Sequence, residues 1–267
     1  MLIPFVKYQG TGNDFIIIDQ TRQTWIRPEH YQLIKLLCDR HFGIGADGLM
    51  MLESSKASAF YMRYYNSDGN PSTMCGNGGR CIAHFAHELN LIGREGFFTA
   101  LDGDHQVKIV SEEKAVKLQL KNVERVSKCN DNEYFLDTGS PHFVKFCKEL
   151  PSDILAEARI VRYNETYRDD GVNVNFATKL SETEDILLAT YERGVEGETL
   201  SCGTGATAVA IAASVQYGLT SPVKLLTKGG ILVVSFDTGV TGFINIWLSG
   251  PAVKVFEGVF DINHFNK

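Results

Sequence analysis

Short β-like runs, some apolar almost throughout and others alternating between apolar and polar residues, recur along the chain and predict β-strands. They include residues 15–19, 60–65, 106–110, 115–120 and 231–236. Clusters of glycine, asparagine and aspartate separate many of these runs, and such clusters are typical of tight turns. Residues 102–103 and 112–114 are predicted to form hairpin turns between successive strands. The pattern therefore indicates a fold rich in short strands.

Four segments have a helical pattern instead. Residues 28–40 and 153–159 are candidates for short helices, and residues 81–89 and 206–215 each follow a glycine-rich turn. The segment 206–215 is apolar almost all round, which predicts a helix that is buried on every side. Many strands around one apolar helix in each half of the chain indicate a duplicated α+β fold.

A polar stretch without clear periodicity, at about residues 121–132, separates the two halves. We therefore predict two domains, residues 1–122 and residues 123–256. A chain of 267 residues has room for two domains of about 130 residues, each with its own hydrophobic core.

A cysteine followed by glycines occurs in both halves. The first copy is Met-Cys-Gly-Asn-Gly-Gly-Arg-Cys at residues 74–81, and the second is Ser-Cys-Gly-Thr-Gly at residues 201–205. Cys202 lies 202 − 75 = 127 residues after Cys75. Because a helical segment follows each copy, each thiol should face N–H groups that have no acceptor within the helix. A single copy could be an ordinary turn beside a small buried residue, but the repetition favours a chemical role.

A helix N-terminus favours the thiolate form of a cysteine only weakly. The helix dipole contributes about 0.3–1 kcal/mol, whereas one pKa unit corresponds to about 1.4 kcal/mol. The dipole alone therefore shifts the pKa of a thiol by less than about one unit. Cysteines with strongly lowered pKa values have other charged neighbours, so further residues must support these two thiols.

Composition and charge favour a small molecule as the ligand. The formal net charge is −6, with 44% hydrophobic and 22% charged residues and no cluster of lysine or arginine. Binding to nucleic acid requires a concentrated basic surface, which argues against that class of partner. No window approaches 18 uninterrupted apolar residues, and the first residues lack a signal-peptide pattern. We therefore expect a cytoplasmic protein with no membrane or nucleic-acid partner.

The remaining sequence signals point away from metals and cofactors. The six cysteines are too sparse for the disulfide framework of a small secreted module, so we expect them to be reduced. The spacing of Cys75 and Cys81 does not match a structural zinc site. The glycines at residues 43 and 45 lack the third glycine and the helix of a dinucleotide-binding motif. No Schiff-base lysine motif stands out, so we expect no metal and no cofactor.

Two thiols in two related halves suit the inversion of a stereocentre by proton transfer. One thiolate removes the α-hydrogen from one face of the carbon, and a thiol on the opposite face delivers another. The two titrations would be coupled, so the pKa values belong to the pair. The helix N-termini could also stabilise the α-carboxylate as negative charge develops on it.

Together, four motifs resemble those of the diaminopimelate epimerase family. They are Gly-Thr-Gly-Asn-Asp-Phe at 10–15, the cysteine motif at 74–81, Tyr-Glu-Arg-Gly at 191–194 and Ser-Cys-Gly-Thr-Gly-Ala at 201–206, and the resemblance runs from residue 5 to about 257. It implies an α+β fold of two pseudo-symmetric domains, each a mostly antiparallel β-sheet or barrel wrapped around a central helix. It also implies that residues 257–267 return to the first domain.

The same resemblance implies an activity. Members of this family are cytoplasmic isomerases, usually homodimers, that need no pyridoxal phosphate. They interconvert LL- and meso-2,6-diaminopimelate in lysine and peptidoglycan biosynthesis.

The family's functional residues map onto this chain at matching positions. Cys75 and Cys202 would be the acid–base pair, with Cys202 accepting the proton from the LL substrate and Cys75 donating one. His142 and Glu192 would adjust the protonation of the thiols. The residues implied in substrate binding are Asn13, Asn66, Gly76, Asn77, Asn173, Glu192, Arg193, Gly203 and Thr204. Main-chain N–H groups of residues 76, 77, 203 and 204 would bind the reacting carboxylate, and Arg193 would bind the distal one.

Simpler explanations exist for several of these side chains. Asn13 and Asn66 could serve turn geometry alone. His142 could merely complete a turn, and Glu192 and Arg193 could form an exposed ion pair worth about 0–1 kcal/mol.

Two positions depart from the family pattern. Gly48 stands where the family often has glutamine, and Ser140 stands where it often has asparagine. Both positions bear on the identity of the substrate. Two alternatives to the epimerase stay open: a related racemase for proline, hydroxyproline or histidine, and a non-catalytic amino-acid-binding protein in which the cysteines are structural. Arg193 favours a substrate with a distal carboxylate, because proline has no group for such a clamp.

Overall fold

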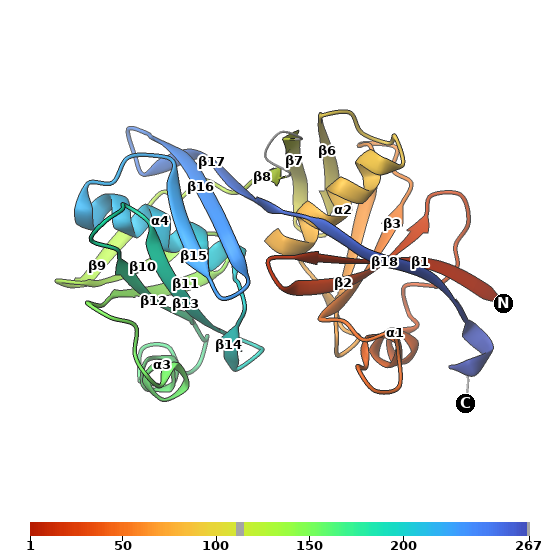
Figure 1. The fold of residues 1–267 in the computed structure, drawn as a ribbon, viewed down its shortest axis with the longest axis horizontal. Helices are drawn as coiled ribbons and strands as arrows, with labels where there is room; N and C mark the ends of the chain where they lie inside the picture. The colour runs from red at the N-terminus through yellow and green to blue at the C-terminus, as the bar shows by residue number, and fades with distance from the viewer. Residues whose placement is uncertain (111–114, 266–267) are drawn as a thin grey trace. The chain divides into compact units, whose positions relative to one another are not determined.

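The computed structural model describes residues 1–110 and 115–265 (Figure 1). The turn predicted at residues 112–114 lies outside these residues. The chain forms two compact units, Met1–Leu118 with Pro251–Lys267, and Gln119–Gly250. The junctions predicted from the sequence, 122/123 and 256/257, are a few residues later in the chain.

The first unit contains most of the short strands of the N-terminal half together with the last strand of the chain. Its strands are β1 (Leu2–Gly10), β2 (Asn13–Gln20), β3 (Gly48–Glu53), β4 (Tyr61–Asn66), β5 (Pro71–Ser72), β6 (Glu95–Ala100), β7 (Gly103–Val110), β8 (Ala115–Gln119) and β18 (Val253–Asp261). Its helices are α1 (Tyr31–Cys38), α2 (Gly76–Glu88) and the short 3-10 helix η1 (Ile262–His264).

Helix α2 is central to the first unit. The strands follow the order β18-β1-β2-β3-β4-β6-β7-β8, in which β2–β3 and β4–β6 are parallel pairs and the others are antiparallel. Helix α2 packs against β1, β2, β3 and β7. In Figure 1 β18 runs alongside β1, in agreement with their antiparallel register.

The apolar run in β2 shows why this sheet is covered on both faces. All four residues from Phe15 to Ile18 are buried. Ile16 and Ile18 pack with residues of α1 in one hydrophobic cluster, whereas Phe15 lies beside Gly78 of α2 on the other face. A strand covered on both faces reads as a continuous apolar run rather than as an alternation.

The second unit is built in the same way. Its strands are β9 (Val126–Asn130), β10 (Glu133–Asp137), β11 (Pro141–Phe146), β12 (Asn173–Lys179), β13 (Ile186–Glu192), β14 (Gly197–Thr199), β15 (Val223–Thr227), β16 (Gly230–Thr238) and β17 (Phe243–Pro251). Its helices are α3 (Ile154–Arg162) and α4 (Gly203–Tyr217).

The pairing order of the second unit repeats that of the first. The order is β9-β10-β11-β12-β13-β15-β16-β17, with β11–β12 and β13–β15 parallel and the other pairs antiparallel. Helix α4 packs against β10, β11, β12, β13, β15 and β16, as α2 packs on its own strands. The prediction of an α+β fold with two related, mostly antiparallel halves around central helices is confirmed.

Three local features differ from the sequence-based expectations. The two central helices begin at the glycines directly after the cysteines, several residues before the predicted starts. The helix expected to be buried on every side is buried from Ala206 to Ala213, but Val215 and Tyr217 near its end are exposed. The polar stretch at 121–132 contains β9, whose mostly exposed residues explain the missing alternation.

Candidate active site

Cys75 is the N-cap residue of α2. Its backbone is extended (φ −94°, ψ 130°), and no side chain caps the helix. The Cys75 carbonyl accepts the first helical hydrogen bond, from Gly79 N–H at 2.7 Å. The thiol is half-buried, while residues 76–80 of the first turn are buried. A helix start of this kind directs backbone N–H groups toward an anion.

The side chain of Asn13 contacts the Cys75 thiol. A tight turn with positive φ at Thr11 (51°) and Gly12 (86°) joins β1 to β2 and places Asn13 at the first position of β2. Asn13 Oδ1 accepts from Cys75 Sγ at 3.6 Å and from Asn77 Nδ2 at 3.4 Å. Asn13 Nδ2 donates to Asp47 Oδ2 at 2.6 Å, which fixes the orientation of the amide. An acceptor facing the sulfur favours the protonated thiol.

Arg80 is a residue of this group that the sequence analysis did not select. Its guanidinium is completely buried and donates to Asn77 Oδ1 at 2.9 Å, to Thr11 Oγ1 at 3.3 Å and to the Gly76 carbonyl at 3.3 Å. It therefore ties the first turn of α2 to the β1–β2 turn. Its place in the cysteine motif could have indicated a special role. It lies about one helical turn after Asn77, near the start of the helix, where the helix dipole disfavours a cation.

The space beside Gly48 is filled by neighbouring residues. A Cβ at this position would lie 2.5 Å from Tyr64 Cε2 and 2.6 Å from the Tyr65 carbonyl oxygen. Asn66 lies opposite Gly48 in the β3–β4 register, with its side chain exposed. In the described part of the chain, Asn66 is outside the hydrogen-bonded group formed by Asn13, Cys75 and Asn77.

We expect Gly48→Ala to lower the free energy of unfolding by about 1–3 kcal/mol, because the added methyl group would displace Tyr64 or the backbone. The measurement is urea denaturation of both proteins. Gly93→Ala is a matched control, since a Cβ there would meet only one atom, at 3.9 Å. Equal stability of the two variants would show that the space at Gly48 is not restricted.

Cys202 occupies the equivalent position in the second unit. It is the N-cap residue of α4, with an extended backbone (φ −122°, ψ 117°) and a side chain that is 8% exposed. Its Sγ lies 3.4 Å from Thr204 Oγ1. The Thr204 carbonyl accepts from Thr138 Oγ1 at 3.0 Å, which fixes the first turn of α4 against the end of β10. Both motif cysteines therefore precede a helix that is central to its own unit.

His142 is a neutral, completely buried histidine. Burial, aided by repulsion from Arg193, lowers its pKa to about 3. The amide of Asn175 lies 3.1 Å from His142 Nδ1 and donates to the Phe143 carbonyl at 2.9 Å, while its oxygen accepts from Thr190 at 2.9 Å. Since the amide nitrogen can only donate, His142 Nδ1 accepts and Nε2 carries the proton. Nε2 is buried without a hydrogen-bond partner in the described structure.

Asn175 connects His142 to the start of α4. A Cβ at Gly205 would lie 2.5 Å from Asn175 Oδ1 and 3.3 Å from Cys202 Cβ, so the absence of a side chain at Gly205 allows this close packing. The resemblance implied a role for Asn173 but none for Asn175. The sequence did contain a signal for Asn175. Residues two apart in a strand face the same side of the sheet, so Asn175 was expected on the same face as Asn173.

Asn173, Ser140 and Arg193 form a second group in this unit. Asn173 Nδ2 donates to Ser140 Oγ at 2.8 Å and to the Pro141 carbonyl at 3.0 Å. Asn173 Oδ1 accepts from the Arg193 backbone N–H at 2.9 Å. Ser140, the second position at which the resemblance was incomplete, thus accepts a hydrogen bond directly from Asn173. The Arg193 side chain is exposed, and its Nη1 donates to the Asp170 carbonyl at 2.7 Å.

Glu192 ends β13 opposite Gly197 of β14. Its Oε1 accepts from Thr199 Oγ1 at 2.6 Å, and the side chain is half-buried. The β13–β14 hairpin therefore orients this carboxylate, and β14 leads directly toward Cys202 along the chain.

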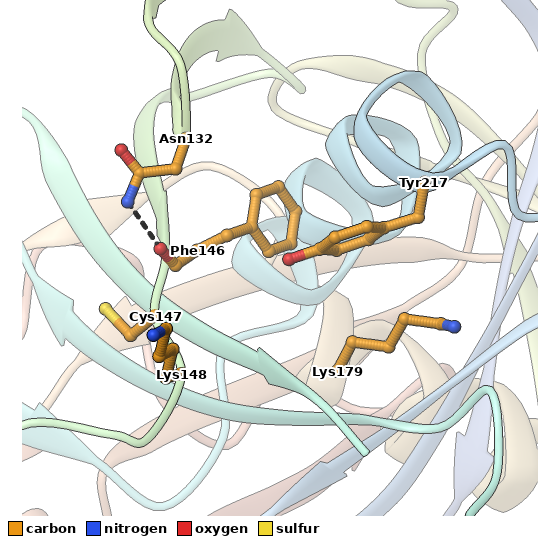
Figure 2. A pocket seen from close by; sticks show the side chains of 6 residues that line it. All are labelled: Asn132, Phe146, Cys147, Lys148, Lys179 and Tyr217. Carbon is orange, nitrogen blue, oxygen red and sulfur yellow. Dashed lines mark hydrogen bonds between the residues drawn. The ribbon is translucent and has the colours of Figure 1, made fainter. Parts of the chain in front are cut away.

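The cavity in Figure 2 is separate from the Cys202 group. It has a volume of about 590 Å³ and is lined by Asn132, Phe146, Cys147, Lys148, Lys179 and Tyr217. Tyr217 is the last of the 15 residues of α4, whereas Cys202 precedes the first. A helix of this length spans about 22 Å. The cavity therefore lies at the opposite end of α4.

Two further observations concern residues 1–110 and 115–265. No group of three or more His, Cys, Asp or Glu side chains there could hold a metal ion. None of the described helices is long and apolar enough to cross a membrane.

Comparison with known proteins gives a consistent assignment. A family model described as diaminopimelate epimerase matches residues 5–126 and 134–254. A diaminopimelate epimerase of Flavobacterium psychrophilum is 51% identical over 253 residues, which cover 94% of this chain and 97% of that protein. A diaminopimelate epimerase of Aquifex aeolicus is 36% identical, with 95% and 96% coverage.

Solved structures with little sequence identity share the fold. A phenazine biosynthesis protein of the PhzF family from Bacillus anthracis has a TM-score of 0.74 at 13% identity, covering 98% of this chain and 100% of its own. A probable proline racemase from Agrobacterium radiobacter has a TM-score of 0.65 at 12% identity, covering 99% and 94%. The fold is thus common to several enzymes, and the sequence matches distinguish among them: this chain belongs to the diaminopimelate epimerase family.

Proposed function

We propose that the protein is a cofactor-independent isomerase that interconverts LL- and meso-2,6-diaminopimelate, in the biosynthesis of lysine and peptidoglycan. The observation that carries this proposal is the family match over residues 5–126 and 134–254. The duplicated N-cap cysteines, one at the start of each central helix, supply the pair of groups that the reaction requires.

In this proposal Cys75 and Cys202 act on opposite faces of one carbon. With the LL substrate, the Cys202 thiolate takes the α-proton and the Cys75 thiol donates a proton to the other face. The α-carbon thus loses one hydrogen and gains another, and the carbanion between the two steps is stabilised as its charge spreads into the α-carboxylate. In the reverse direction the two cysteines exchange roles.

The first turns of the two central helices would bind the α-carboxylate. Gly76, Asn77, Gly203 and Thr204 present backbone N–H groups at these turns, and preorganised donors stabilise charge that develops in the transition state. The absence of a side-chain cap on either helix supports this role.

We assign His142 and Glu192 to adjusting the protonation of the thiols, and Asn13, Asn66, Asn173 and Arg193 to binding the substrate. The exposed guanidinium of Arg193 suits a distal carboxylate, because arginine binds carboxylates through two parallel hydrogen bonds. Its backbone is fixed by Asn173 and its side chain by the Asp170 carbonyl. A proline-type substrate has no distal carboxylate for this arginine to bind.

The experiment that tests this function is an assay of purified protein with LL-diaminopimelate and no added cofactor, read by chromatography that separates the stereoisomers. We expect conversion to a mixture with the meso isomer, and no racemisation of L-proline. Turnover of proline but not of diaminopimelate would refute the substrate assignment. Binding of diaminopimelate without turnover would refute the catalytic one.

We further propose that the protein is a cytoplasmic homodimer. Support comes from apolar side chains that are exposed along the paired strands β1 and β18: Leu2, Val255, Phe256 and Val259 are 63%, 54%, 47% and 63% exposed. Exposed apolar surface of this kind is typical of an interface between proteins.

We expect sedimentation analysis of the wild-type protein to give a dimer and of Phe256→Glu to give a monomer, because a charge in an apolar interface would be desolvated without a partner. Val215→Glu, at an exposed apolar position on α4, should remain dimeric. A monomeric wild-type protein would contradict the proposed assembly.

A further inference from the structure

Arg80 is a buried cation with only neutral hydrogen-bond acceptors. Its side chain is completely buried, and its three acceptors are the Asn77 amide oxygen, the Thr11 hydroxyl and the Gly76 carbonyl. Arg80 Nε is buried with no hydrogen-bond partner in the described structure. No carboxylate of residues 1–110 or 115–265 forms an ion pair with it. A buried charge without a counter-charge is strongly unfavourable.

The position of Arg80 increases this cost. It lies in the first turns of α2, where the helix dipole already places partial positive charge. Burial lowers the pKa of Arg80, whereas attraction to Cys81 and Cys75 acts in the opposite direction. Arginine nevertheless remains protonated in proteins. An anion close to the start of α2 would therefore stabilise the structure.

Cys81 does not supply that anion at neutral pH. It is completely buried, and burial raises its pKa to about 12. Cys75 differs because it is half-buried and lies at the N-cap of the same helix. Cys75 also shares hydrogen-bond partners with Arg80: the Asn77 amide accepts from Arg80 at 2.9 Å and donates to Asn13 Oδ1, the same oxygen that accepts from Cys75 Sγ.

Charged groups on the neighbouring elements have partners of their own. Asp47 Oδ2 accepts from the Asn13 amide, and Asp47 Oδ1 accepts from Arg40. Asp14 is paired with Lys7 and Arg40. On the β6–β7 side, Asp102 Oδ1 accepts from the Met74 N–H at 3.2 Å and pairs with His105 Nε2 at 3.2 Å.

We propose that Arg80 is a positioning residue whose buried guanidinium is the counter-charge of the Cys75 thiolate. Two opposite influences then act on this sulfur. Asn13 Oδ1, oriented by Asp47, favours the thiol, and Arg80 favours the thiolate. Both forms are needed in the function proposed above, on which this inference rests, because Cys75 donates a proton in one direction and accepts one in the other.

The test measures the pH dependence of alkylation at Cys75 in the full-length protein without substrate. Iodoacetamide is the probe, and peptide-resolved mass spectrometry reports each cysteine separately. We expect the Cys75 midpoint of the wild-type protein to lie below that of Cys147, a half-buried thiol in the second unit that serves as internal reference. A Cys75 midpoint at or above that of Cys147 would overturn the proposal without any variant.

Arg80→Met removes the charge and keeps much of the volume, and Arg80→Lys keeps the charge. We expect Arg80→Met to raise the Cys75 midpoint by about one pH unit or more, with that of Cys147 unchanged, and Arg80→Lys to stay closer to the wild type. If Arg80→Met does not fold, Arg80→Gln makes the same comparison. An unchanged midpoint in a folded, uncharged variant would overturn the proposal.

The readout is independent of turnover. A protein that does not convert diaminopimelate could still show the shift in alkylation, and an active protein could lack it. Failure of the Arg80 assignment is therefore distinguishable from failure of the proposed function.

Discussion

Cys75→Ala and Cys202→Ala are each expected to reduce epimerisation of LL-diaminopimelate by about 10³-fold or more, because positioned acid–base groups contribute rate factors of about 10²–10⁴. Inversion needs both a base and an acid, so removing either thiol should be as damaging as removing both. The measurement is the initial rate of meso-isomer formation by each single variant and by the double variant.

Cys147→Ala is the matched control for these substitutions. This thiol lines the cavity at the far end of α4 and should be dispensable for the reaction. Circular dichroism checks that each variant keeps the fold. A folded Cys75→Ala or Cys202→Ala variant with near wild-type activity would refute the two-thiol mechanism.

The free energy of unfolding is expected to fall as the pH is lowered from about 6.5 toward 3, and His142 should be a main cause. Burial holds the folded-state pKa of His142 at about 3, whereas the ordinary value is about 6.5. Above pH 6.5 the residue is neutral in both states. Between the two values the unfolded state binds the proton and the folded state does not, so stability decreases by up to about 1.4 kcal/mol per pH unit.

Urea denaturation at a series of pH values measures this effect. His142→Gln retains a polar side chain that does not titrate, so its stability should depend less steeply on pH between 3 and 6.5. Burial opposes ionisation of Asp14, but hydrogen bonds from Arg40 and Lys7 outweigh it and lower the pKa of Asp14 to about 2. Asp14 therefore affects the pH dependence mainly below about pH 4, and it does so equally in the variant and the wild type. If the unfolding free energies of the variant and the wild type depend on pH identically, the pKa of His142 is not lowered by burial and this prediction is wrong.

The repeated cysteine motif was the sequence feature that predicted most about the fold and the site. The two cysteine motifs, 127 residues apart, predicted two equivalent helix starts. The structure has Cys75 and Cys202 at the N-caps of α2 and α4, each central to a unit with the same strand order. The signal was strong because a thiol, small residues and a helical pattern occur together twice.

Helix boundaries were predicted less well, for a physical reason. Glycine has a low intrinsic helix propensity, so the glycines after each cysteine read as a turn. In the structure they form the first helical turn, and close neighbours explain why glycines rather than larger residues stand there. A Cβ at Gly78, for example, would lie 3.2 Å from Met50 Sδ.

Arg80 and Asn175 were missed because their roles depend on contacts between segments far apart in the sequence. Arg80 reaches Thr11, 69 residues earlier, and Asn175 reaches His142, 33 residues earlier. From the sequence pattern alone, Arg80 would be placed on the surface of a helix and Asn175 in a strand, with no further role for either. Only the packing within each unit shows that both side chains are completely buried.

The structure also shows the surroundings of residues 48 and 140, the two positions at which the resemblance was incomplete. Tyr64 fills the space that a side chain at Gly48 would need, and the Ser140 hydroxyl accepts a hydrogen bond from Asn173.

Incorporation of deuterium during turnover of LL-diaminopimelate in D2O tests the two-thiol account most directly. If one thiol removes the α-proton and the other delivers a solvent-derived one, the first meso product should carry one deuterium at the inverted carbon. The LL substrate that remains at early times should carry almost none. Product that retains its original hydrogen, or deuterium that enters the substrate and product equally from the start, would contradict a mechanism with two separate proton carriers.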